Sequence, residues 1–157
     1  MLARIKHFFE SLTGEEAPAS LGEDEIRLAV AALLYHVIAI DGVVSEAERT
    51  TLTDVLKQEF DLDPAETREL VAAAQEADAE AVDLYGFTSV LKRRMEVGDR
   101  ERVIRMMWQM VYADGGVHEF EDNIVWRVAE LLAVPTQVRI GLKQSVRSES
   151  DEEEERE

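Results

Sequence analysis

Residues 38–48 read IAIDGVVSEAE, and residues 111–121 read VYADGGVHEFE. The two segments lie 73 positions apart and share the Asp-Gly pair, one valine and two glutamates at the same offsets. In each copy, an apolar stretch with helical spacing precedes the Asp-Gly pair, and a second one follows the glutamates. This pattern predicts a duplicated unit of helix, acidic turn and helix.

Helical spacing of apolar residues continues through nearly the whole chain, and alternating strand patterns are almost absent. We therefore expect an all-α fold, a single bundle of about seven to eight helices with an internal duplication. Ser45 with Glu48 matches a capping box, as does Ser20 with Glu23. The expected helices cover approximately residues 2–12, 23–40, 45–60, 63–77, 83–97, 99–111, 118–133 and 135–147.

Changes in composition divide the chain into three parts. Residues 1–22 are expected to form an amphipathic helix and a small, polar linker. Residues 23–147 carry the helical pattern and are expected to form one domain with a central buried helix up to Ile40. Residues 148–157 are of low complexity and strongly acidic, which predicts a disordered tail.

The chain is acidic well beyond this tail. Its formal net charge is −17, and residues 149–157 account for only −6 of it. Nucleic acid and anionic membrane surfaces would be repelled by such a surface, whereas metal cations and basic partners would be attracted. The 157 residues contain no cysteine, which excludes disulfides and thiolate chemistry. No signal peptide and no apolar run of about 20 residues is present, so a cytoplasmic protein is expected.

The two acidic turns are the candidate metal site. Asp41 and Asp114 follow the last turn of an apolar helix, where the partial negative charge of the helix end disfavours a carboxylate and a bound cation would favour it. Two glutamates follow each aspartate at the start of the next helix. Ca²⁺, Mg²⁺ and Mn²⁺ prefer oxygen ligands, and two converging turns offer enough of them. The candidate ligands are Asp41, Glu46, Glu48, Asp114, Glu119 and Glu121.

A purely structural interpretation of the same residues stays open. Asp-Gly is a common turn because glycine accepts a positive φ, and Glu48 can simply complete the capping box with Ser45. Glu46 and Glu119 suit the amino-terminal end of a helix. Neither turn has the Asp-x-Asp-x-Asp-Gly series of an EF-hand.

Other residues offer less chemistry. His7, His36 and His118 are far apart in the sequence, and His36 is expected to be a hydrogen-bonded core residue. Met106, Met107 and Met110 beside Trp108 have the spacing of a helix core. The run Lys92-Arg93-Arg94 is more typical of a solvated face than of a nucleic-acid surface. No nucleophile motif or phosphate-binding glycine loop is present, so an enzyme is the least favoured class.

The paired motifs resemble the TerB family of tellurite resistance proteins, with the likeness extending over about residues 25–146. The resemblance implies a TerB-like helical domain, an acidic motif that binds divalent metal, and a role in the response to tellurite and other stresses without enzymatic activity. By position, the residues that match the acidic motif are Asp41, Glu48, Asp114 and Glu121.

We therefore expect a non-enzymatic protein that binds a divalent cation and transmits this state to a protein partner. Association with a membrane would then be indirect, through that partner, and no nucleic-acid binding is expected. The alternative is a metal-independent scaffold for protein–protein interactions, which would hold a basic partner and weaken in salt. The sequence leaves the metal, the partner and the oligomeric state open.

Overall fold

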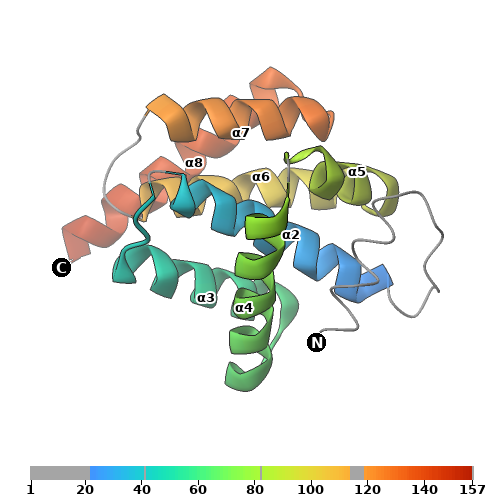
Figure 1. Ribbon diagram of the computed structural model, residues 1–157. Helices are drawn as coiled ribbons and strands as arrows, with labels where there is room; N and C mark the ends of the chain where they lie inside the picture. Colours follow the sequence, from blue (N-terminus) through green and yellow to red (C-terminus); the bar gives the residue numbers. More distant parts are fainter. Residues whose placement is uncertain (1–21, 41, 82, 114–118, 157) are drawn as a thin grey trace.

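The computed structural model describes residues 22–40, 42–81, 83–113 and 119–156. These residues form α-helices joined by short connections, and they contain no strand (Figure 1). The expected all-α fold is confirmed. The expected helix over residues 2–12 and the capping box of Ser20 lie outside the described residues. The helices are α2 (Gly22–Ala39), α3 (Glu46–Phe60), α4 (Pro64–Glu80), α5 (Tyr85–Arg94), α6 (Val97–Tyr112), α7 (Glu119–Leu131) and α8 (Thr136–Arg156).

Helix α2 is the centre of the bundle, as its apolar sequence predicts. All residues from Leu28 to Ile38 are buried except His36. Helices α3, α4, α5 and α6 all pack against α2, with α4 making the most extensive contact. A helix that is apolar on every side is stable in water only when neighbours cover all its faces, which α2 achieves.

Helix α6 forms the second half of the core. The methionines at 106, 107 and 110 and the Trp108 ring are buried, which confirms their expected place in the core. The Trp108 indole Nε1–H donates a hydrogen bond to the carbonyl oxygen of Arg139 in α8 over 3.2 Å. This bond satisfies the single polar group of a fully buried ring and connects α6 to α8.

Reciprocal capping boxes start α3 and α4. At α3, the Ser45 Oγ accepts from the Glu48 backbone N–H, and the Glu48 Oε1 accepts from the Ser45 backbone N–H, both over 3.1 Å. At α4, the Asp63 Oδ1 accepts from the Glu66 backbone N–H over 2.7 Å, and the Glu66 Oε1 accepts from the Asp63 N–H over 3.2 Å. Each box satisfies backbone donors that the first helical turn leaves unpaired.

Two other helix ends differ from the sequence expectation. Helix α6 begins at Val97 with Glu96 as its N-cap, so Asp99 lies within the first turn instead of capping it. Helix α8 continues to Arg156, beyond the expected helix end near residue 147, and the expected disorder of residues 148–157 stays a prediction. The guanidinium of Arg105 in α6 holds this extension, because it contacts both the Ser145 hydroxyl and the Glu149 carboxylate.

Polar contacts between distant helices accompany the apolar packing. His36 Nδ1 in α2 lies 2.8 Å from Asp78 Oδ1 in α4, which confirms the expected hydrogen bond, but the His36 side chain is 33% exposed and does not belong to the core. Glu25, in the first turn of α2, is only 3% exposed. Arg94 Nε at the end of α5 lies 3.2 Å from Glu25 Oε2, but neither carboxylate oxygen of Glu25 receives a well-oriented hydrogen bond within the described structure.

None of the helices in the described ranges combines the length and apolar content that a crossing of the bilayer requires.

Candidate metal-binding turns

The first acidic turn connects α2 to α3 through a glycine in the left-handed region. Gly42 has a φ of +84°, and its backbone N–H donates to the Ala39 carbonyl oxygen over 3.0 Å. Residues with a Cβ are disfavoured at this φ, so glycine is the residue that suits this position. Asp41 itself lies outside the described residues, and the position of its carboxylate therefore stays a prediction.

The two glutamates after this turn have different surroundings. Glu46 is exposed to solvent, whereas Glu48 is only 7% exposed and is part of the capping box with Ser45. Side chains two positions apart on a helix do not face each other. A single ion at this turn would therefore take Glu48 or Glu46, but not both.

The second acidic turn falls largely outside the described residues. Asp114 lies in this gap, and the side chain of Glu119 is not described either. Glu121, the counterpart of Glu48, is half-buried in the first turn of α7. Its neighbour Asp122 pairs with Lys143 of α8, whose Nζ lies 2.8 Å from Asp122 Oδ1.

The helices that flank the two turns end at equivalent positions. Helix α2 ends at Ala39 and α6 ends 73 positions later at Tyr112, while α3 begins at Glu46 and α7 begins 73 positions later at Glu119. Helices α2 and α6 pack on each other, and both end at the left side of the bundle in Figure 1. The offset found in the sequence therefore also relates the helix ends.

The grouping of the six candidate ligands is not decided by these residues. Among the side chains that the structure describes, no three from Asp, Glu or His lie close enough to hold a metal ion. Both aspartates and the Glu119 side chain fall outside that set. The six-residue metal site thus stays a prediction.

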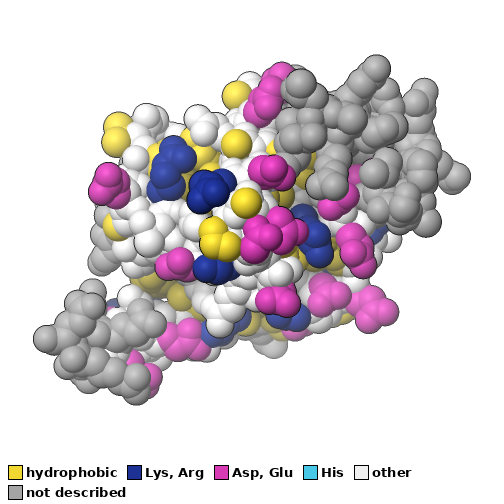
Figure 2. Space-filling model, turned by 90° about the horizontal axis from the view of Figure 1, so that it is seen from below, with side chains coloured by type: hydrophobic (Ala, Val, Ile, Leu, Met, Phe, Trp, Pro, Cys, Tyr) yellow, Lys and Arg dark blue, Asp and Glu magenta, His cyan; other side chains and the backbone are white. Residues whose placement is uncertain are grey.

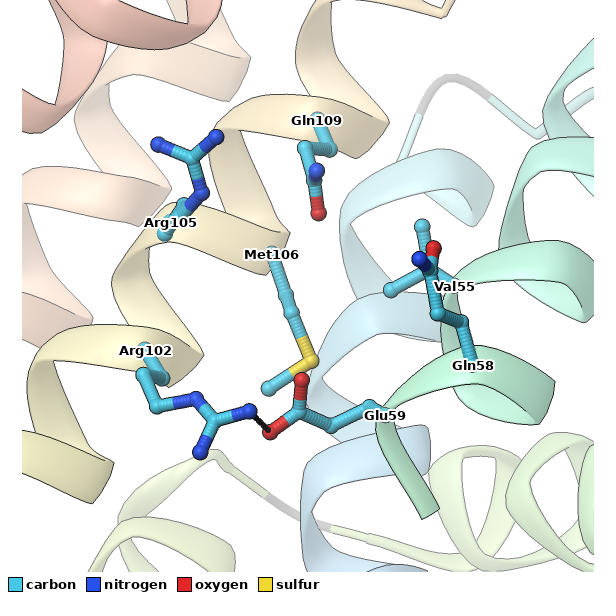
Figure 3. A pocket seen from close by; sticks show the side chains of 7 residues that line it. All are labelled: Val55, Gln58, Glu59, Arg102, Arg105, Met106 and Gln109. Atoms are coloured by element: carbon cyan, nitrogen blue, oxygen red, sulfur yellow. Dashed lines mark ion pairs between the residues drawn. The ribbon is translucent and has the colours of Figure 1, made fainter. Parts of the chain in front are cut away.

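Two grooves beside α3 carry functional groups that sequence reasoning missed. The first, the α3/α6 groove, encloses about 320 Å³ (Figure 3). Its two arginines are neutralised by the chain itself: Arg102 Nη2 lies 2.8 Å from Glu59 Oε1, and Arg105 pairs with Glu149. The residues lining this groove are Val55, Gln58, Glu59, Arg102, Arg105, Met106 and Gln109.

The second, the α3/α4 groove, lies between α3 and α4 and encloses about 200 Å³. Two arginines line it as well, Arg49 from α3 and Arg68 from α4. Neither pair was predicted from the sequence, because Arg49 and Arg68 lie on different helices, and the acidic partners of Arg102 and Arg105 belong to other helices than α6. The residues lining this groove are Arg49, Thr53, Arg68, Val71, Ala72 and Gln75.

One comparison with known proteins identifies a family. The family model described as tellurite resistance protein TerB matches residues 27–144. No curated protein and no solved structure shows a significant match to the chain. The matched segment runs from the second turn of α2 into α8 and includes both acidic turns. Because it covers well over half of the sequence, this chain belongs to the TerB family, which is associated with tellurite resistance and is generally non-catalytic.

Proposed function

We propose that this TerB-family protein binds a divalent cation at its acidic turns and presents the metal-bound state to a protein partner. The favoured ligands are Asp41 and Glu48 at the first turn and Asp114 and Glu121 at the second, together with carbonyl oxygens of the turns. The single observation that carries the proposal is the repeat of the helix ends at the same 73-residue offset on two helices that pack together.

The location of the turns gives a cation an electrostatic role. Each aspartate follows a helix carboxyl-terminus, where the unpaired carbonyl groups already concentrate negative potential. A formal charge of −17 adds to the repulsion between such carboxylates. A divalent cation would reverse the sign of this interaction and would stabilise the ends of α2 and α6, so binding would be coupled to folding stability.

The surroundings of Glu48 fit a ligand for a hard cation. One of its carboxylate oxygens is oriented by the Ser45 backbone N–H, which fixes the side chain at the start of α3. The other oxygen accepts no hydrogen bond from the described residues. Oxygen donors of this kind suit Ca²⁺, Mg²⁺ and Mn²⁺. Glu46, which is exposed to solvent, and its counterpart Glu119 would be alternative ligands.

Exposed apolar residues beside the first turn suggest how a partner would sense the metal. Ile40 is 38% exposed and Val43 is 70% exposed, and they flank Asp41-Gly42 on either side. A partner that contacts these two side chains would bind next to the metal ligands. Binding of the cation at the turn would then change the contact surface directly. A role in the tellurite or general stress response follows from the family and is part of this proposal.

The test is a calorimetric titration of the metal-stripped full chain with Ca²⁺, Mg²⁺ and Mn²⁺, combined with thermal unfolding. We expect at least one of these ions to bind and to raise the melting temperature. Asp41→Ala with Asp114→Ala should abolish both effects. The matched control is Asp54→Ala with Glu69→Ala, which removes two exposed carboxylates of α3 and α4 away from the turns. An equal response of both double variants would contradict the site.

The second candidate function is a metal-independent interaction scaffold, which the exposure of Ile40 and Val43 also supports. It predicts that no divalent ion shifts the melting temperature. It also predicts that a basic partner binds the metal-stripped chain and dissociates as salt is added. Val43→Ser would weaken binding of the partner. Neither the parent chain nor Asp41→Ala would show a shift in melting temperature with metal.

A further inference from the structure

The α3/α4 groove differs from the rest of this acidic surface. Acidic side chains are spread widely over the face shown in Figure 2, and the lysines and arginines form separate groups between them. Arg49 and Arg68 line one groove of about 200 Å³, and no acidic side chain is among its described lining residues. A local positive site on a protein with a net charge of −17 is unexpected on composition alone.

Neither arginine of this groove is neutralised by the chain. Among the described residues, Arg49 and Arg68 form no ion pair, although both are exposed. Arg68 does act at a distance on Asp63, as the smallest of the causes that lower the pKa of that carboxyl. The Asp63 carboxylate, however, is already held by the Glu66 backbone N–H and does not line the groove. The donors of both guanidinium groups are therefore available to a ligand.

The other lining residues limit what such a ligand can be. The Thr53 hydroxyl donates to the Arg49 carbonyl oxygen over 2.9 Å, so its proton is already used. Gln75 adds an amide donor at the rim, and the buried Val71 with Ala72 forms an apolar wall. Pockets for drug-sized ligands typically enclose about 300–1,000 Å³, so a cavity of about 200 Å³ favours a small ion with its water over a nucleotide.

We propose that the α3/α4 groove binds a small doubly charged oxyanion of the phosphate or sulfate type between the guanidinium groups of Arg49 and Arg68. Planar guanidinium groups match the spacing of oxyanion oxygens and donate two parallel hydrogen bonds. Val71 and Ala72 supply the apolar surface beside the two guanidinium groups. This site is independent of the cation proposed at the acidic turns and requires no bound metal.

The test is a titration of the full, metal-stripped chain with inorganic phosphate at low ionic strength, followed by calorimetry and by amide NMR shifts. We expect saturable binding with shifts centred on α3 and α4. Because exposed charge pairs contribute modestly, Arg49→Gln with Arg68→Gln should weaken binding by about fivefold to tenfold. Arg102→Gln with Arg105→Gln is the matched control, with the same change in charge in the α3/α6 groove, and should bind within about twofold of the parent.

A competition with sulfate sharpens this test. A site that selects phosphate over sulfate needs an acceptor for the phosphate proton, and no acidic side chain lines the described groove. Sulfate should therefore displace phosphate. The proposal is overturned if the parent chain shows no saturable binding, if the two double variants lose binding equally, or if sulfate fails to compete. Asp41→Ala with Asp114→Ala should bind phosphate like the parent, which separates this site from the cation proposal.

Discussion

The two sides of α3 carry the same kind of residue in different electrostatic states. In the α3/α6 groove, Arg102 and Arg105 are paired with Glu59 and Glu149. In the α3/α4 groove, Arg49 and Arg68 have no such partner among the described residues. An arginine is thus a candidate for ligand binding because of what surrounds it, and the residue type alone does not decide this.

The grooves also differ in how they are built. Met106, which is 4% exposed and points into the α3/α6 groove in Figure 3, belongs to the core of α6. Val71, which is 7% exposed, belongs to the same core and lines the α3/α4 groove from α4. Both grooves therefore lie over the core, but the core side chain in the α3/α6 groove is longer and slightly more buried than the one in the α3/α4 groove.

The largest expected effect tests this difference in depth. Met106→Ala should lower the free energy of unfolding by about 3 kcal/mol, because it leaves a cavity against the core. Val71→Ala removes less buried surface and should cost about 1.5 kcal/mol. Urea denaturation monitored by circular dichroism gives both values. An equal or larger loss of unfolding free energy for Val71→Ala would show that the two side chains are equally important to the core.

The next effect concerns the two capping boxes. One starts α3, which lines both grooves, and the other starts α4, which lines only the α3/α4 groove. The backbone N–H of Glu66 holds the pKa of Asp63 below its ordinary value. A carboxyl whose pKa is lower in the folded state than in the unfolded state, where it is about 3.9, stabilises the fold at pH values above about 3.9. This stabilisation is lost as the pH falls through the folded-state pKa. Asp63→Ala should therefore lower the melting temperature more at pH 7 than at pH 2.5.

Ser45→Ala is the control for this titration. Its hydroxyl carries no titrating charge, so the loss of about 1 kcal/mol typical of an N-cap should change less with pH. Thermal unfolding of both variants and the parent at the two pH values makes the comparison. A penalty for Asp63→Ala that stays the same at pH 2.5 would argue against the lowered pKa.

The smallest expected effect concerns the arginines themselves. The Arg102–Glu59 pair is 59% and 22% exposed at its two side chains, so its coupling in a double-mutant cycle should be between about 0.2 and 1 kcal/mol. Arg49→Gln should leave the free energy of unfolding unchanged within about 0.5 kcal/mol, as is usual for surface substitutions. A clear loss of stability in Arg49→Gln would reveal a structural role and weaken the contrast between the grooves.

Helix starts that depend on residues close together in the sequence were predictable. Ser45 with Glu48 and Asp63 with Glu66 fix the starts of α3 and α4 because capping boxes use residues only three positions apart. The start of α6 was misplaced because Asp99 resembles a cap, whereas the chain uses Glu96 without a side-chain cap. The length of α8 was underestimated because its extension depends on Arg105, a residue from another helix.

The candidate sites were predictable only where the signal is repeated along the chain. The acidic turns were recognised because Asp41 and Asp114 recur in the same sequence context. The sequence drew attention to Lys92-Arg93-Arg94, although Arg94 is occupied by Glu25. Arg49 and Arg68 are 19 positions apart, and only the packing of α3 on α4 brings them to one groove. Pairing across helices of this kind carries no periodicity that a single sequence would reveal.

The buried carboxylate of Glu25 has an evolutionary consequence. The carboxylate lies close to the guanidinium of Arg94, at the end of α5. Substitution of only one of these two residues leaves the other without its opposite charge. The two positions therefore cannot drift independently. Among descendants of this chain, we expect an apolar residue at position 25 to occur together with the loss of arginine at position 94, so the pair should be inherited or abandoned as a unit.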